Sequence, residues 1–172
     1  MTYEVIDNFL PEYQFKQLKN IMMGTNFAWF YSDGVNASYH KTQWQLCHIF
    51  YYDGEKGPDG GPLKSNYLPL MDPLVDKLGI KNLFRIKANL QTRTIFHRKD
   101  EYHVDYNCSE KDLMMTAVYY LNTNNGWTEF KNGGKVKSVA NRMIMFDTTL
   151  LHRGVTCTDE KTRVLINFNW KE

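Results

Sequence analysis

Short runs of strand-forming residues follow one another through the second half of the chain, after residue 83. Turn sequences such as "NTNNG" and "KNGG" separate several of them, and tight turns favour asparagine and glycine. Because no helical segment lies between these runs, they indicate a sandwich or jelly roll rather than alternating strands and helices. The runs cover residues 84–92, 102–106, 114–121, 127–131, 135–139, 142–147, 152–157 and 162–170.

The first 83 residues contain two segments with helical features. Pro11 suits the first turn of a helix, and apolar residues at helical spacing continue to about residue 23. A second helix is predicted within residues 66–79, with Pro69 and Pro73 as interruptions and Gly79 as its stop. Residues 44–52 have the composition of a strand, and the glycine-rich stretch 53–62 has that of a loop.

These elements predict a mainly β chain with N-terminal helices (α+β) and a double-stranded β-helix (jelly roll, cupin-like). The length of 172 residues is that of one domain. We therefore predict a single domain, residues 1–172. Within it, residues 1–83 form a helical and strand support region, and residues 84–170 form the double-stranded β-helix core.

Charge and composition argue against several classes of protein. The formal charge is +2, from 21 basic and 19 acidic residues, which is too balanced for a nucleic-acid or membrane surface. The N-terminus has no basic segment followed by an apolar one, and no apolar run is long enough to span a bilayer. Three cysteines, an odd number without framework spacing, indicate reduced thiols. These features predict a cytoplasmic protein.

The sequence "EYHVDYN" places His103 and Asp105 two residues apart in a strand-like run. Residues i and i+2 of a strand point to the same face, so the two side chains project together. His152 follows the apolar run "RMIMFD", and two histidines with one carboxylate match the facial triad of non-heme Fe(II) oxygenases. The alternative is a surface strand with ordinary polar residues. His152 and a further residue, Arg163, favour the metal site.

Arg163 lies in the strand-like sequence "TRVLINFNW" and shares a face with Leu165, Asn167 and Asn169. A buried arginine on the inward face of a small barrel needs an anion. Its fork fits a carboxylate through two hydrogen bonds. The C5 carboxylate of 2-oxoglutarate is the natural candidate.

Residues 84–170 resemble the catalytic core of Fe(II)- and 2-oxoglutarate-dependent dioxygenases, in the prolyl-4-hydroxylase-like branch. The resemblance rests on "HVD", "AVYYLNTNNGWTEF", "NRMIMFDTTLLHRGV" and "RVLINFNW", which occur in the family order. His152 lies 47 residues after Asp105, a spacing typical of that family. The N-terminal "VIDNFLPEYQFKQL" also looks like the opening strand and helix of such enzymes.

The resemblance implies cofactors, site residues and an activity. His103, Asp105 and His152 would be the catalytic metal ligands for Fe(II), with 2-oxoglutarate and O2 as cosubstrates. Arg163 and Tyr120 would hold the far carboxylate of 2-oxoglutarate. Where related enzymes often carry Asn-x-Tyr, Asn89 matches and Gln91 departs from the pattern; both are candidate cosubstrate contacts. The implied activity is hydroxylation of a C–H bond, most simply of a prolyl residue in a peptide or protein, with release of succinate and CO2.

Other functions remain open at the level of sequence. A non-catalytic jelly-roll module that binds a peptide or carbohydrate would need no metal, and a Zn(II) hydrolase could use the same three ligands. We expect a peptide, protein or small-molecule substrate, and no nucleic-acid or membrane partner. The aromatic residues Trp29, Phe30, Tyr31 and Trp44 either line a peptide groove or form core between helix and sheet, and we favour the core.

Overall fold

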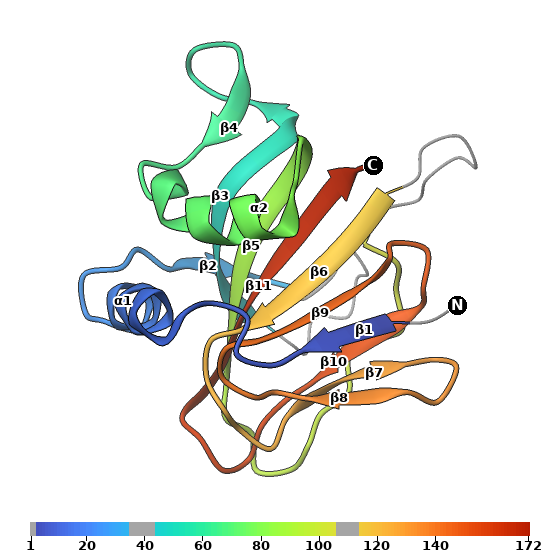
Figure 1. Ribbon diagram of the computed structural model, residues 1–172. Helices are drawn as coiled ribbons and strands as arrows, with labels where there is room; N and C mark the ends of the chain where they lie inside the picture. Colours follow the sequence, from blue (N-terminus) through green and yellow to red (C-terminus); the bar gives the residue numbers. More distant parts are fainter. Residues whose placement is uncertain (1–2, 35–43, 106–113) are drawn as a thin grey trace.

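The computed structural model describes residues 3–34, 44–105 and 114–172, which form two antiparallel sheets and N-terminal helices (Figure 1). The mainly β fold and the double-stranded β-helix predicted from the sequence are confirmed. The larger sheet has the order β1 (Tyr3–Ile6), β9 (Arg142–Asp147), β6 (Met114–Tyr120), β11 (Thr162–Lys171), β5 (Asn82–Thr92), β3 (Gln45–Lys56) and β2 (Phe30–Ser32), with β4 (Pro62–Lys64) paired to β3. The smaller sheet has the order β10 (His152–Val155), β7 (Trp127–Phe130) and β8 (Lys135–Lys137).

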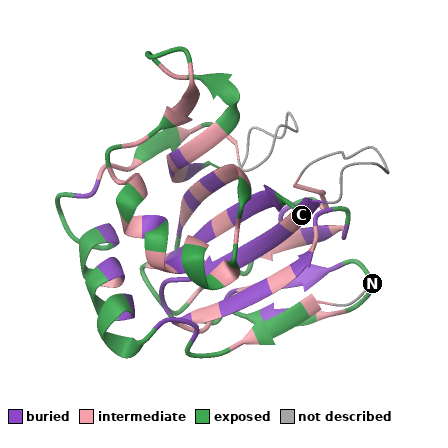
Figure 2. Cartoon of the chain, turned by 45° about the horizontal axis from the view of Figure 1, so that its top comes forward, coloured by how far each residue is buried: buried purple, intermediate pink, exposed green. Residues whose placement is uncertain are grey.

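Helices cover one face of the larger sheet (Figure 1). They are α1 (Glu12–Met22), the 3-10 turn η1 (Leu68–Met71) and α2 (Asp72–Leu78). In α1, Phe15, Leu18 and Met22 are buried at helical spacing, and Figure 2 shows the other side of this helix exposed. Gly79 ends α2 in the left-handed conformation, at φ 67°, as expected for a glycine stop.

Alternation along the central strands separates two environments. Ile86 and Ala88 of β5 and Ile166 and Phe168 of β11 face the helices in one large apolar cluster. The residues between them face the opposite way, toward the smaller sheet, and most are polar. A second apolar cluster fills one end of this interior, and its members are Val118, Tyr120, Phe130, Val136, Ile144, Phe146, Leu150 and Leu165.

Two predictions about local structure are wrong. Residues 102–105 do not form a regular strand; His103 makes only an isolated antiparallel bridge with His152, and residue 106 lies outside the described ranges. The predicted loop at 53–62 begins later, because β3 continues to Lys56 and pairs with β4.

The preferred placement of the N-terminal aromatic residues in the core is also wrong for three of the four. Phe30, Tyr31 and Trp44 are 58%, 65% and 48% exposed, whereas Trp29 packs partly buried against the core. The physical reason is position: Phe30 and Tyr31 lie on β2, the last strand of the larger sheet in the described ranges, and Trp44 lies just before β3, the strand paired with β2. None of the helices in the described ranges has the length and apolar character needed to span a membrane.

A buried asparagine ties the segment before α1 to the sheet. Asn141 precedes β9 and has a φ of 61°, a conformation that L-residues other than asparagine and glycine rarely adopt. Its Oδ1 accepts hydrogen bonds from the Leu10 backbone N–H (2.8 Å) and the Tyr119 hydroxyl (2.6 Å), and its Nδ2 donates to the Leu10 carbonyl (2.8 Å). One side chain therefore links β6, β9 and the entry to α1.

Replacing this asparagine tests the link. Asn141→Ala should lower the free energy of unfolding by about 3 kcal/mol, because three buried hydrogen bonds are lost and alanine is strained at positive φ. Asn141→Gly loses the same bonds without that strain, so its cost should be about 1 kcal/mol smaller. Denaturant unfolding of both variants measures the difference. Equal costs for the two would show that the backbone conformation does not matter here.

Candidate metal centre

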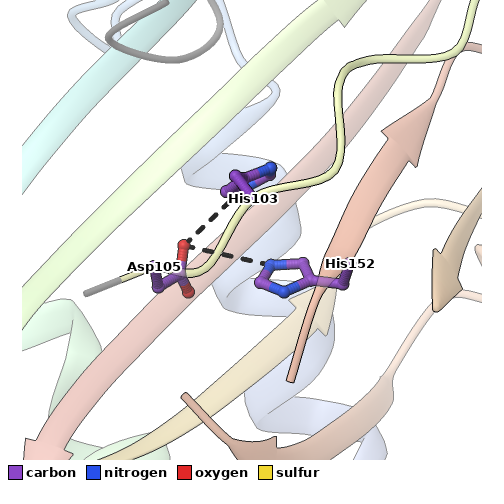
Figure 3. A group of neighbouring side chains, drawn as sticks. All are labelled: His103, Asp105 and His152. Atoms are coloured by element: carbon purple, nitrogen blue, oxygen red, sulfur yellow. Dashed lines mark ion pairs between the residues drawn. The ribbon is translucent and has the colours of Figure 1, made fainter. Parts of the chain in front are cut away.

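Three potential metal ligands meet in the interior between the sheets (Figure 3). One ligand atom from each of His103, Asp105 and His152 lies within 4.8 Å of the others. Asp105 Oδ1 is 3.9 Å from Nε2 of His103 and 3.9 Å from Nε2 of His152. The structure thus brings together the three residues that the sequence singled out, and their role as ligands stays a prediction.

A backbone bridge sets the two histidines side by side. The His103 N–H donates to the His152 carbonyl at 2.9 Å, and the His152 N–H donates to the His103 carbonyl at 3.0 Å. This reciprocal pair is the closely hydrogen-bonded type of antiparallel pairing. The ring centroids of the two imidazoles lie 4.6 Å apart. His103 therefore reaches the site through its bond to the first residue of β10, without belonging to a strand itself.

Hydrogen bonds orient both imidazole rings. Nδ1 of His152 lies 2.9 Å from the Leu150 carbonyl oxygen, and Nδ1 of His103 lies 3.1 Å from that of Glu101. A carbonyl oxygen only accepts, so each Nδ1 carries a proton, and the neutral form of such a ring has its lone pair on Nε2. Burial, with a contribution from His152, lowers the pKa of His103 and favours the neutral ring. Neutral imidazoles oriented in this way are suited to bind a metal ion.

The carboxylate of Asp105 is also fixed in place. Its Oδ2 accepts a hydrogen bond from Asn169 Nδ2 at 3.1 Å, and its Oδ1 lies 3.5 Å from Nη2 of Arg85. Arg85 is itself held by Asn169, whose Oδ1 accepts from Arg85 Nε at 3.0 Å. Burial opposes the charged form of Asp105, but His152, Arg85, His103 and the Asn169 hydrogen bond together lower its pKa. The site thus offers two imidazole nitrogens and one carboxylate oxygen, a donor set that fits Fe(II).

A buried arginine lies in the same interior. Arg163 is 1% exposed and donates hydrogen bonds to Ser138 Oγ (3.0 Å), Gln91 Oε1 (3.2 Å) and Thr128 Oγ1 (3.2 Å). Its guanidinium lies 5.7 Å from the ring centroid of Tyr120, whose hydroxyl donates to Thr128 Oγ1 at 2.7 Å. All the hydrogen-bond acceptors of Arg163 in the described ranges are neutral. The structure places Arg163 beside Tyr120, and their binding of 2-oxoglutarate stays a prediction.

Gln91 links Arg163 to an acid that the sequence analysis missed. Asp100 is buried, and its Oδ2 accepts a hydrogen bond from Gln91 Nε2 at 3.3 Å. Its Oδ1 is buried without a partner in the described part of the chain, and burial raises the pKa of Asp100. Asp100 stands in the charged sequence "HRKDE", whose composition indicates an exposed segment. Gln91, which stands where related enzymes often carry tyrosine, thus donates a hydrogen bond to Asp100 and accepts one from Arg163.

A second missed residue lies on the outer face of the smaller sheet. Glu129 is almost fully buried, and its Oε1 accepts hydrogen bonds from the Tyr102 hydroxyl (2.9 Å) and from Nε (3.1 Å) and Nη2 of Arg153. Its Oε2 accepts from Trp127 Nε1 at 3.1 Å and pairs with Lys99 Nζ at 3.3 Å. The guanidinium of Arg153 stacks over the Tyr102 ring at 4.1 Å.

The hydrogen bonds of Glu129 hold the segments that carry His103 and His152 together on the outer face of the smaller sheet. Tyr102 precedes His103 and Arg153 follows His152, so Glu129 holds the neighbours of both candidate ligands. Burial opposes the charge on Glu129, but the hydrogen bonds from Arg153, Trp127, Tyr102 and Lys99 lower its pKa from 4.5 to about 2. Its stabilising contribution is therefore complete above about pH 4.5 and is lost as the pH falls toward about 2.

Loss of Glu129 should loosen the candidate metal centre. Glu129→Ala frees Tyr102 and Arg153, and we expect a roughly tenfold rise in the dissociation constant for Co(II), measured by titration of metal-free protein. Glu129→Gln retains the shape and should give a smaller rise. Lys137→Ala, an exposed change on the adjacent strand β8, is the control. An unchanged dissociation constant in Glu129→Ala would contradict a positioning role.

Two histidines and one carboxylate grouped inside a double-stranded β-helix are the arrangement typical of non-heme Fe(II) oxygenases. Comparison with known proteins supports the same class of enzyme. Residues 91–171 match the family model of the 2OG-Fe(II) oxygenase superfamily, which confirms the resemblance drawn from the sequence. The cofactors of that superfamily are Fe(II), 2-oxoglutarate and O2, and the His–Asp–His group fits the metal. The chain matches no curated protein sequence.

Solved structures share the fold at low sequence identity. A viral collagen prolyl hydroxylase from Paramecium bursaria Chlorella virus-1 is 18% identical, with a TM-score of 0.61 over 99% of this chain and 96% of that one. A prolyl-4-hydroxylase from Pseudomonas putida is 15% identical, with a TM-score of 0.62 over 99% and 92%. A prolyl hydroxylase from Trichoplax adhaerens, in complex with a hypoxia inducible factor peptide fragment, is 14% identical, with a TM-score of 0.64 over 98% and 82%.

Proposed function

We propose that the protein is an Fe(II)- and 2-oxoglutarate-dependent dioxygenase that hydroxylates a prolyl residue in a peptide or protein. One observation carries the proposal: the interior face of β11 holds Asn169, which positions Asp105, and also Arg163, which has neutral hydrogen-bond partners. Strand β11 therefore contacts the candidate metal centre through Asn169 and carries a buried cation, Arg163. A ligand that chelates a metal at one end and carries a carboxylate at the other fits this arrangement.

The three proposed ligands supply charge and orientation. The Nε2 atoms of His103 and His152 and the carboxylate of Asp105 would hold the divalent ion, and Asp105 would supply one negative charge beside it. Three protein ligands leave the remaining coordination positions for cosubstrates. When bound, Fe(II) supplies the O2 activation that couples oxidative decarboxylation of 2-oxoglutarate, giving succinate and CO2, to hydroxylation of a C–H bond. The apolar cluster beside His152, including Phe130 and Phe146, keeps that side of the site dry.

The far end of 2-oxoglutarate is assigned to Arg163 and Tyr120. A carboxylate there would replace neutral oxygens as the partner of the guanidinium, and hydrogen bonds between charged groups are about twice as strong as neutral ones. Because burial raises the pKa of Asp100, this acid adds less negative charge beside a bound carboxylate. Asn89, on the same face as Gln91, has a buried Oδ1 without a hydrogen-bond partner in the described ranges, which supports a contact with the cosubstrate.

Exposed aromatic rings support a peptide as the substrate. Phe30 and Tyr31 lie on the edge strand β2. Trp44 immediately precedes β3, the one strand that pairs with β2 in the described ranges. An edge strand offers unpaired backbone groups to an extended peptide, and exposed rings beside it give apolar contact. The similar structures named as prolyl hydroxylases, one of them with a peptide fragment bound, support proline as the residue modified.

The proposal is tested by turnover with matched peptides. Protein supplied with Fe(II), 2-oxoglutarate and O2 is assayed for succinate in the presence of proline-containing peptides and of the same peptides with alanine in place of proline. Proline peptides should raise succinate formation and gain the mass of one oxygen atom. Equal turnover of the alanine peptides would contradict the prolyl assignment. Activity with Zn(II) in place of Fe(II) would contradict the oxygenase itself.

Replacement of the buried arginine separates cosubstrate binding from metal binding. Arg163→Leu should raise the KM for 2-oxoglutarate roughly tenfold to a hundredfold, because a charge-assisted pair is lost, while Fe(II) affinity is retained. Arg93→Leu removes an exposed arginine beyond the end of β5 and is the control. Equal loss of metal and 2-oxoglutarate binding in Arg163→Leu would mean that the residue is structural.

A further inference from the structure

One cation on the interior face of β5 has no role in the proposed reaction. Lys87 is half-buried, lies opposite Asn167 of β11 and pairs on its other side with Ile49 of β3. Its ammonium makes no hydrogen bond and no ion pair among the described residues. The charged or titratable groups that act on it are Cys47, Arg85 and Asp105, and burial is the largest effect, lowering the pKa of Lys87. Asp105, the carboxylate among these groups, is already next to Arg85 and hydrogen-bonded to Asn169, so Lys87 has no acidic partner of its own in the described ranges.

The residue opposite Lys87 is also unsatisfied. Oδ1 of Asn167 is buried and accepts no hydrogen bond within the described ranges. Buried polar atoms without partners are rare and unfavourable in folded proteins, so each one needs an explanation. Lys87 and Asn167 are direct partners in the β5–β11 register and share the interior face. One offers positive charge and N–H donors, and the other offers an acceptor, so a ligand with an anion and an N–H group would satisfy both.

The cosubstrate does not account for this pair. In the proposed function, Arg163 takes the far carboxylate of 2-oxoglutarate and the metal takes its other end. The negative charge of Asp105 already has Arg85 and Asn169 beside it. Lys87 lies beside β3, and β3 pairs with the edge strand β2, which carries the exposed rings. Arg163 lies on β11 four residues before Asn167, the residue opposite Lys87. The unused cation is therefore on the side where the primary substrate is expected to enter.

We infer that Lys87 and Asn167 form a carboxylate subsite for the primary substrate. The inference rests on the proposed function and narrows its substrate class. The substrate carries a carboxylate near the carbon that is hydroxylated, and Asn167 accepts a hydrogen bond from an adjacent N–H. The carboxylate belongs either to a chain end, as in a C-terminal residue that follows the proline, or to an acidic side chain next to the modified residue.

The test compares ligands that differ only in the carboxylate. N-acetyl-L-prolylglycine and its amide, which both keep the glycine N–H beside the proline, are titrated into Zn(II)-loaded protein with 2-oxoglutarate, which does not turn over, and binding is followed by NMR shifts of the side-chain amides. The acid should bind roughly tenfold to a hundredfold tighter than the amide. A second pair, C-terminally amidated proline peptides with aspartate or asparagine after the proline, separates an acidic side chain from a chain end.

Variants of Lys87 assign the preference to this residue. Lys87→Met should abolish the preference for the acid, and Lys87→Arg, which keeps the charge, should retain most of it. Lys81→Met, at an exposed position just before β5, should leave it unchanged. Two-dimensional NMR spectra of each variant establish that the fold is intact before binding is compared.

The outcomes separate this inference from the prolyl assignment. Equal binding of acid and amide in both pairs, or a preference that survives Lys87→Met, would overturn the subsite. Weaker 2-oxoglutarate binding in Lys87→Met with the acid preference unchanged would assign Lys87 to the cosubstrate and also overturn it. If proline ligands fail but N-acetyl derivatives of other amino acids bind with a Lys87-dependent acid preference, the subsite stands and only proline is wrong.

Discussion

The pairing of β5 with β11 is the interaction on which the rest of the structure depends. It packs one set of alternate side chains, including Ile86 and Phe168, against the helices, and it aligns the other set inside the double-stranded β-helix. The same register places Arg163 against Gln91, Asn167 against Lys87 and Asn169 against Arg85. A shift of the β5–β11 register by one residue would turn the apolar side chains toward the interior and the polar ones toward the helices. Packing of the large apolar cluster against the helices therefore also fixes the register of the polar interior residues.

The candidate metal centre depends on a weaker attachment. His103 belongs to no regular strand and is held by its backbone bridge to His152 and, through Tyr102, by the Glu129 network. Glu129 lies on the outer face of the smaller sheet and the two imidazoles lie on its inner face. Contacts on the outer face therefore help to position the histidines on the inner face. Asp105 is positioned independently, through Asn169 and Arg85 of the larger sheet. The three proposed ligands are thus fixed from both sheets.

Much of this arrangement could be predicted from the sequence, and its limits have physical causes. The strands around 84–92, 114–121, 142–147 and 162–170 were predicted within two residues because their alternation and turns are local signals. The triad and Arg163 emerged from residue type, spacing and resemblance. Glu129, Asp100 and Lys87 were missed because a charged residue in a strand or a loop ordinarily faces solvent, and only contacts between distant segments bury these three. The exposure of Phe30 and Tyr31 depends on which strand lies at the edge, which local sequence does not specify.

The central claim is that His103, Asp105 and His152 hold an Fe(II) ion that chelates 2-oxoglutarate. It is tested most directly by visible absorption of the protein under anaerobic conditions, with Fe(II) and 2-oxoglutarate added together. The wild-type protein should develop a weak charge-transfer band that requires both additions, and His103→Ala should not develop it. A wild-type protein without the band, or a His103→Ala variant that retains it at full strength, would contradict the account.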